Sequence, residues 1–140
     1  MGYTLRIEDY STNSKAYSHV IKDMAIRLGL MDNVKYKIGK NGEKDTYRFK
    51  MPVSDFAKLV YNLKEMSEEN SIWDEFRDEC IWSYCDFLIG GSPRTIDMKE
   101  EQKNHYGEWL DIIKRIYGMF LPILLERVWE KKKYVRFVWE

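Results

Sequence analysis

The sequence is poor in the residues that build metal centres and nucleophilic sites. Histidine occurs only at positions 19 and 105, which excludes a histidine-rich metal centre. The two cysteines, Cys80 and Cys85, have a spacing that matches no structural zinc motif, and on one helix they would point about 140° apart. We therefore expect two reduced, buried thiols with no disulfide between them.

Motifs of the common enzyme classes are missing as well. The chain has no phosphate-binding loop, dinucleotide fingerprint, nucleophile elbow or metalloprotease motif. Carboxylates are numerous at residues 65–79, but on an amphipathic helix such residues usually form the solvated face. We expect no cofactor and no metal, and an enzyme is the third of three functional hypotheses.

The chain also lacks net charge and a long apolar run. Its 23 basic and 23 acidic residues cancel, so the total charge indicates no particular partner. Residues 3–9 are interrupted by charge and do not form the apolar stretch of a signal peptide. The most apolar run, at 112–125, is too short to cross a membrane, because a spanning helix needs about 20 apolar residues. We expect a cytoplasmic protein without a membrane partner.

What the chain does contain is typical of a globular domain. Of its 140 residues, 44% are hydrophobic and 33% are charged, so we expect a single domain over 1–140. Aromatic residues make up 15% of the chain, which is unusually many. They either fill a core that is poor in valine and leucine, or they anchor a partner surface rich in tyrosine and tryptophan.

The spacing of apolar residues predicts the fold class. Alternation predicts strands and the helical repeat predicts helices, in the following places: strands at 3–7, 34–38, 46–51 and 134–139, and helices at 17–28, 56–66, 73–88 and 106–124. This order predicts an α+β fold with a small antiparallel sheet of about four strands. We expect the helices to pack on one face of the sheet, around a buried C-terminal helix.

The two middle strands form a predicted hairpin. A turn at 41–42 would place Tyr36 opposite Tyr47 and Lys35 opposite Arg48, while a longer loop would shift these pairs. In either case the cationic side chains alternate with the apolar ones along each strand. The hairpin should therefore have one apolar face and one basic face.

Three local features mark where the helices begin and bend. Ser54 is the predicted cap of the second helix, and Ser71 with Asp74 resembles a capping box at the start of the third. Pro122 lies inside the last helix, where its ring would clash with the carbonyl of Gly118. We expect a kink at Pro122 rather than a break.

Charge is segregated along the chain. Residues 33–50 carry six basic and two acidic side chains, a net charge of +4, whereas residues 55–86 carry nine acidic and three basic ones, a net charge of −6. The leading hypothesis is a non-catalytic interaction module, a regulator or inhibitor that binds another protein through an acidic helical surface and exposed aromatics. That surface would comprise Glu68, Glu69, Trp73, Asp74, Glu75, Asp78, Glu79 and Trp82. A homo-oligomer also stays open.

The alternative hypothesis is a nucleotide- or nucleic-acid-binding protein that uses the basic hairpin face. Its candidate residues are Lys35, Lys37, Arg48 and Lys50, with Arg94 in the loop at 90–95, and Arg6 and Arg136 would join them if the end strands lie in the same sheet. The same lysines would also suit an edge hairpin that is protected from pairing with other chains. Base stacking is not expected, because the hairpin aromatics fall on the apolar side.

Overall fold

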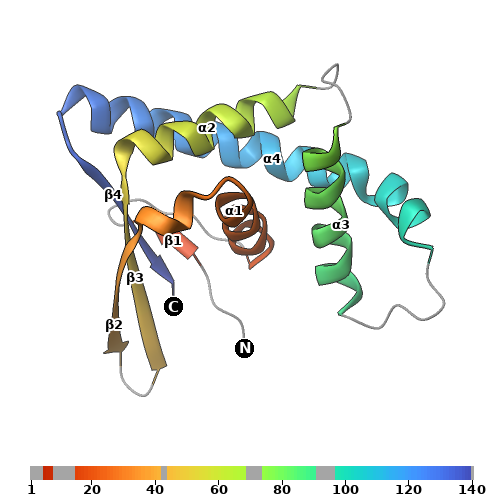
Figure 1. The fold of residues 1–140 in the computed structure, drawn as a ribbon, viewed down its shortest axis with the longest axis horizontal. Helices are drawn as coiled ribbons and strands as arrows, with labels where there is room; N and C mark the ends of the chain where they lie inside the picture. The colour runs from red at the N-terminus through yellow and green to blue at the C-terminus, as the bar shows by residue number, and fades with distance from the viewer. Residues whose placement is uncertain (1–4, 8–14, 42–43, 69–73, 91–96, 140) are drawn as a thin grey trace.

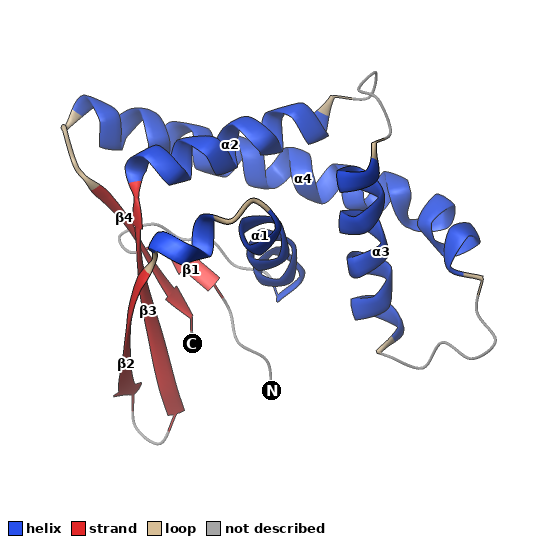
Figure 2. Cartoon of the chain, viewed as in Figure 1, coloured by secondary structure: helices blue, strands red, loops and turns tan. Residues whose placement is uncertain are grey.

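The computed structural model describes residues 5–7, 15–41, 44–68, 74–90 and 97–139. Its elements confirm the predicted α+β fold and the order of strands and helices along the chain (Figure 2). They are β1 (Leu5–Ile7), α1 (Lys15–Arg27), a short 3-10 helix η1 (Leu30–Asn33), β2 (Lys35–Asn41), β3 (Lys44–Pro52), α2 (Val53–Ser67), α3 (Glu75–Ile89), α4 (Met98–Trp129) and β4 (Tyr134–Trp139).

The four strands form one antiparallel sheet in the order β1-β4-β3-β2. The last strand of the chain is therefore inserted between the first strand and the hairpin, and β3 and β4 are the two central strands (Figure 1). Helices cover the face of the sheet that carries Phe49 and Phe137, as the alternation predicts. The opposite face carries the cationic positions.

The predicted pairs of the hairpin are wrong by two residues. Tyr36 pairs with Phe49 rather than Tyr47, and Lys35 pairs with Lys50 rather than Arg48. The strands extend beyond the predicted turn, and the connecting residues 42–43 lie outside the described residues. A shift of two positions keeps every side chain on its predicted face, because the period of a strand is two.

Two predicted helix caps also differ from the structure. Pro52 occupies the cap position of α2, so Ser54 lies within its first turn. At α3 the cap is Asp74, whose carboxylate accepts a hydrogen bond of 2.8 Å from the backbone N–H of Arg77. The helix begins at Glu75, and Ser71 lies outside the described residues.

The last helix, α4, continues through Pro122 without a break. It packs against both α2 and α3, and Trp109, Ile113 and Ile116 are fully buried along its length. Its last two turns differ from the predicted core helix, because Trp129 there is 85% exposed. Among the described residues, no helix has the length and apolar character needed to cross a membrane.

Three aromatic rings join the layers of the core. Phe56 of α2 lies 5.3 Å from Phe120 of α4 and 6.0 Å from Phe137 of β4, measured between ring centroids. Phe120 and Phe137 are 6.3 Å apart in an edge-on arrangement, which is a favourable geometry for aromatic pairs. The aromatic content of the sequence thus contributes to the contact between the sheet and the two long helices.

Candidate functional site

The outward face of the sheet gathers cations from all four strands. Backbone pairing places Arg6, Val138, Arg48 and Lys37 in one row across the sheet. Arg136, Lys50 and Lys35 occupy the next row. We call these six cationic positions the basic face: Arg6, Lys35, Lys37, Arg48, Lys50 and Arg136. The strand order thus brings Arg6 and Arg136 to the hairpin cations, as expected if the end strands share the sheet.

The basic face has no acidic counterpart within the sheet. Within the four strands β1, β2, β3 and β4, no outward position is occupied by aspartate or glutamate. Lys37, Arg48 and Arg136 are exposed, and they form no hydrogen bond or ion pair with any other described residue. Lys50 places its ammonium 4.2 Å from the centroid of the Tyr134 ring. Lys37, Arg48 and Arg136 are therefore three members of the basic face whose charge no other described residue engages.

Like charges on directly paired residues carry an energetic cost. Lys37 lies opposite Arg48, and Lys50 lies between Lys35 and Arg136. Directly opposed like charges destabilise a sheet, each pair by an amount on the order of 0.2–1 kcal/mol. A sequence that keeps several such pairs on one face needs a physical reason for them.

Protection of sheet edges does not provide that reason. Cationic side chains on an edge strand hinder pairing with other chains, and the edge strands of this sheet are β1 and β2. Arg48 and Lys50 instead belong to β3, which at both positions pairs with β2 on one side and with β4 on the other. Among the described residues, Arg136 pairs with Lys50 alone, because β1 reaches only residues 137–139 of β4. Edge protection therefore leaves the cations of β3 unexplained.

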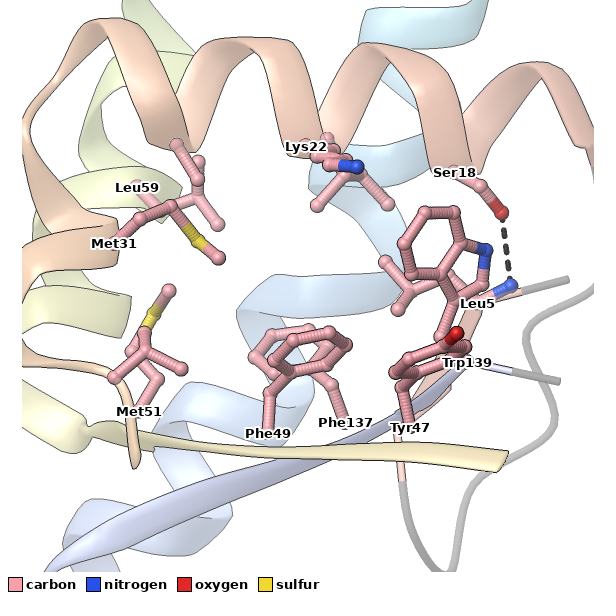
Figure 3. A pocket seen from close by; sticks show the side chains of 13 residues that line it. Leu5, Ser18, Lys22, Met31, Tyr47, Phe49, Met51, Leu59, Phe137 and Trp139 are labelled. Carbon is pink, nitrogen blue, oxygen red and sulfur yellow. Dashed lines mark hydrogen bonds between the residues drawn. The ribbon is translucent and has the colours of Figure 1, made fainter. Parts of the chain in front are cut away.

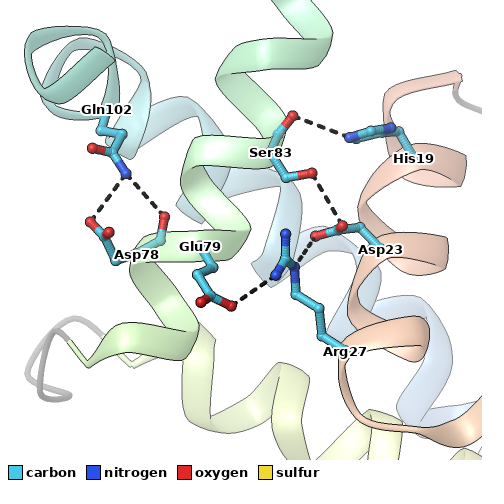
Figure 4. Close-up of polar contacts among 7 residues, drawn as sticks. All are labelled: His19, Asp23, Arg27, Asp78, Glu79, Ser83 and Gln102. Atoms are coloured by element: carbon cyan, nitrogen blue, oxygen red, sulfur yellow. Dashed lines mark hydrogen bonds and ion pairs between the residues drawn. The ribbon is translucent and has the colours of Figure 1, made fainter.

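Several carboxylates of the predicted acidic surface have partners inside the molecule (Figure 4). The backbone carbonyl and Oδ1 of Asp78 accept hydrogen bonds of 3.0 Å and 3.1 Å from Nε2 of Gln102 on α4. Glu79 accepts a bond of 2.8 Å from Arg27 of α1. With Asp74 capping α3, three of the predicted acidic residues hold helices in place.

The rest of the predicted acidic surface is only partly described. Glu68 and Glu75 are exposed, and Trp82 is 46% exposed. Glu69, Trp73 and Arg94 lie outside the described residues. Trp82 is therefore the aromatic residue of this surface that the structure places in contact with solvent.

The same region contains a buried cation. Arg77, one of the three basic residues in the acidic segment 55–86, is 2% exposed. Its guanidinium donates hydrogen bonds to the carbonyls of Glu65 and Met66 at 3.3 Å and 3.2 Å, and to the hydroxyl of Tyr106 at 3.2 Å. These carbonyls belong to the last turn of α2, so Arg77 satisfies helix-end groups from a neighbouring helix.

The two thiols are buried and reduced, as predicted. Burial raises the pKa of Cys80 to about 12 and that of Cys85 to about 11. A thiol with so high a pKa is protonated at neutral pH, and the thiolate is the nucleophilic form. Within the described part of the chain, no three His, Cys, Asp or Glu residues are grouped so that they could hold a metal ion.

A cavity of about 250 Å³ lies between α1 and the covered face of the sheet (Figure 3). Phe49, Met51 and Phe137 line it from the sheet, and Ala25 and Lys22 line it from α1. The sequence does not predict this cavity. Its one available signal was the presence of small residues on the predicted inner face of the first helix.

Comparisons with models of protein families, with curated proteins and with solved structures found no match. Function therefore has to be inferred from the geometry and charge of the molecule itself. Two features are chemically distinctive. One side of the sheet carries the basic face, on which Lys37, Arg48 and Arg136 have no partner among the described residues, and the other side borders an apolar cavity.

Proposed function

We propose that this protein binds the phosphate backbone of nucleic acid through the basic face. The observation that carries the proposal is the set of unpaired cations on the central strands, above all Arg48 and Arg136. Lysine and arginine clustered on one face are the usual electrostatic footprint of nucleic-acid binding. Because the formal net charge is zero, attraction would come from this face and not from the molecule as a whole.

The spacing of the basic face suits a flexible polyanion. Neighbouring strands are about 4.8 Å apart and alternate residues along a strand are about 6.7 Å apart, so the long side chains can reach successive phosphates. The aromatic side chains of Tyr47 and Phe49 belong to the covered face. On the outward side Tyr134 lies against Lys50, so stacking would be limited to the margin of the basic face. Binding would therefore rest mainly on phosphates, with little dependence on base sequence.

A salt titration tests this proposal directly. Labelled oligonucleotides of unrelated sequence should bind with similar affinity, and log Kobs should fall linearly with log salt concentration. Four phosphate contacts would give a slope of about −3 for a single strand, because each contact contributes about −0.7. Fluorescence anisotropy at several salt concentrations measures both the affinity and the slope.

Charge-neutral variants show how much each residue contributes to the slope of the salt dependence. Lys37→Gln, Arg48→Gln and Arg136→Gln should each make the slope shallower by about 0.7. Lys103→Gln is the matched control, because Lys103 is exposed on α4 and lies outside the sheet. Absence of binding at low salt, or a triple variant that binds as tightly as the natural protein, would refute the proposal.

The protein-binding hypothesis is the second candidate, and Trp82 favours it. Glu75, Glu79 and Trp82 are exposed and follow one another at the spacing of a single helix face. An exposed tryptophan is a typical anchor of protein interfaces. This surface would bind a partner with a basic rim around an apolar recess.

Its test compares two exposed tryptophans. A partner recovered in stoichiometric amount should be lost with Trp82→Ala and weakened with Glu75→Lys. Trp129→Ala is the control, since Trp129 is even more exposed but lies at the end of α4. Equal recovery with all three variants would exclude the acidic helical surface as the binding site.

A further inference from the structure

The cavity beneath α1 is built from apolar side chains. Its lining comes from α1, η1, Leu59 of α2 and the covered face of the sheet, and its volume is about 250 Å³ (Figure 3). Two residues explain why this space is not filled. Ser18 and Ala25 present short side chains from α1 toward the sheet, where Phe49 and Phe137 lie.

Water is a poor occupant of such a space. A buried water needs two to four polar partners, and cavities lined by apolar groups usually stay dry. The hydroxyl oxygen of Ser18 already accepts a hydrogen bond of 2.8 Å from the backbone N–H of Leu5. The lining thus favours a hydrocarbon occupant.

Among the described residues that line the cavity, Lys22 is the charged one. Its ammonium lies 4.2 Å from the centroid of the Trp139 ring, and its side chain is exposed. Within the described part of the chain it forms no ion pair with a carboxylate. The adjacent carboxylate, Asp23, is turned instead to Arg27 and to Ser83.

The volume limits the size of an occupant. A cavity of about 150 Å³ accommodates benzene, so a cavity of about 250 Å³ should hold about ten non-hydrogen atoms. An alkyl chain of this size would fill the apolar space. A terminal anionic group would then reach the ammonium of Lys22.

We propose that this cavity binds a linear alkyl carboxylate of about eight to ten carbons, with Lys22 pairing with the carboxylate. The alkyl chain of the ligand lies between α1 and the sheet, and its carboxylate remains at the solvent-exposed side, next to Lys22. This site uses the face of the sheet opposite the basic face. It therefore does not depend on nucleic-acid binding.

Calorimetric titration with a series of carboxylates tests the proposal. From butanoate upward, Kd should fall about fourfold for each added methylene, which is the effect of burying one such group. The decrease should stop at about eight to ten carbons, where the cavity is full. An affinity that does not change with chain length, or no detectable binding of any member, would refute the site.

Lys22→Met tests the charge separately from the cavity. The variant should lose about fivefold in affinity for decanoate, which is the upper range for an exposed ion pair, and should bind decanol as the natural protein does. Lys103→Met is the control and should change neither affinity. An unchanged preference for decanoate over decanol in Lys22→Met would overturn the assignment of Lys22.

Filling the cavity gives an independent result. Ala25→Leu adds a side chain into the space and should abolish binding of both ligands while circular dichroism remains that of the folded protein. A folded Ala25→Leu protein that binds decanoate normally would refute the site. If this variant does not fold, the comparison of decanoate and decanol binding in Lys22→Met tests the site instead. Arg48→Gln should leave decanoate affinity unchanged, so the two proposed sites can fail separately.

Discussion

Removal of one charge from the basic face should stabilise the protein. Arg48 lies directly opposite Lys37, and no described residue neutralises either of them. We expect Arg48→Gln to raise the free energy of unfolding, because it removes the repulsion between this pair. Glutamine also retains part of the aliphatic stem beside Val138, which is 1% exposed although it lies on the outward face.

The size of the effect follows from Coulomb's law. Two unit charges separated by about 5 Å repel each other by about 0.8 kcal/mol in water. Long side chains diverge from each other, so we expect a gain of about 0.5 kcal/mol at low salt. In 1 M salt the Debye length falls to about 3 Å, and the gain should nearly vanish.

Urea unfolding at low and at high salt measures this gain. The midpoint of Arg48→Gln should increase by about 0.3 M at low salt with an unchanged m-value. Lys103→Gln should show no gain that depends on salt. If Arg48→Gln were less stable than the natural protein by the same amount at both salt concentrations, Arg48 would act through packing, and the repulsion argument would be wrong.

The same variant should bind nucleic acid more weakly. A residue whose removal increases stability and decreases binding shows the usual conflict between the two properties. This combination distinguishes a binding surface from a structural one, because a structural cation would lose stability on substitution.

Three further predictions concern the residues that hold the helices together. Arg77→Met should lower the free energy of unfolding in urea by about 3 kcal/mol, because the carbonyls of α2 lose their donors, and Arg77→Lys should not restore it. Above about pH 9 an unfolded chain releases the protons of Cys80 and Cys85 while the folded chain keeps them, so stability should decrease as pH rises. The loss from these thiols should reach about 3 kcal/mol at pH 10 in urea titrations, and a double alanine variant should show a flatter profile. Asp74→Ala should cost about 1 kcal/mol in thermal unfolding as a lost helix cap, whereas Glu75→Ala should have little effect; equal losses would exclude the capping role.

Strand faces could be predicted from the sequence more reliably than strand pairs. The alternation of Arg48 and Lys50 with Tyr47 and Phe49 fixes which side chains share a face, whatever the register. The pair opposite each residue depends on the turn, and Asn41 pairs with Lys44 instead of forming the turn. The error was therefore confined to the pairs, and the composition of the basic face was predicted correctly.

The order of strands in the sheet could not be predicted in this way. Alternation in β4 is the same whether Arg136 lies at an edge or in the middle of the sheet. The insertion of β4 between β1 and β3 depends on contacts between the two ends of the chain. With β4 beside it, β3 is a central strand, so edge protection does not explain Arg48.

The sequence also does not predict which acidic side chains have partners within the molecule. On a helical repeat Asp78 and Glu79 have the pattern of a solvated face, and Arg77 precedes them in the same segment. Their partners, Gln102 and Arg27, come from helices distant in the chain. Only the packing of α3 between α1 and α4 shows that Asp78 and Glu79 form hydrogen bonds with neighbouring helices.

These contacts explain how a protein with no formal net charge can present a surface of one sign. Arg27 forms ion pairs with Asp23 and Glu79, and Arg77 donates hydrogen bonds to carbonyls at the end of α2. The sheet contains no comparable acceptor for Arg48, because every outward strand position around it is neutral or cationic. These cations of the helical layer thus have partners, whereas Arg48 on the sheet has none among the described residues. A partner would respond to this local field, since charges farther away than a Debye length are screened.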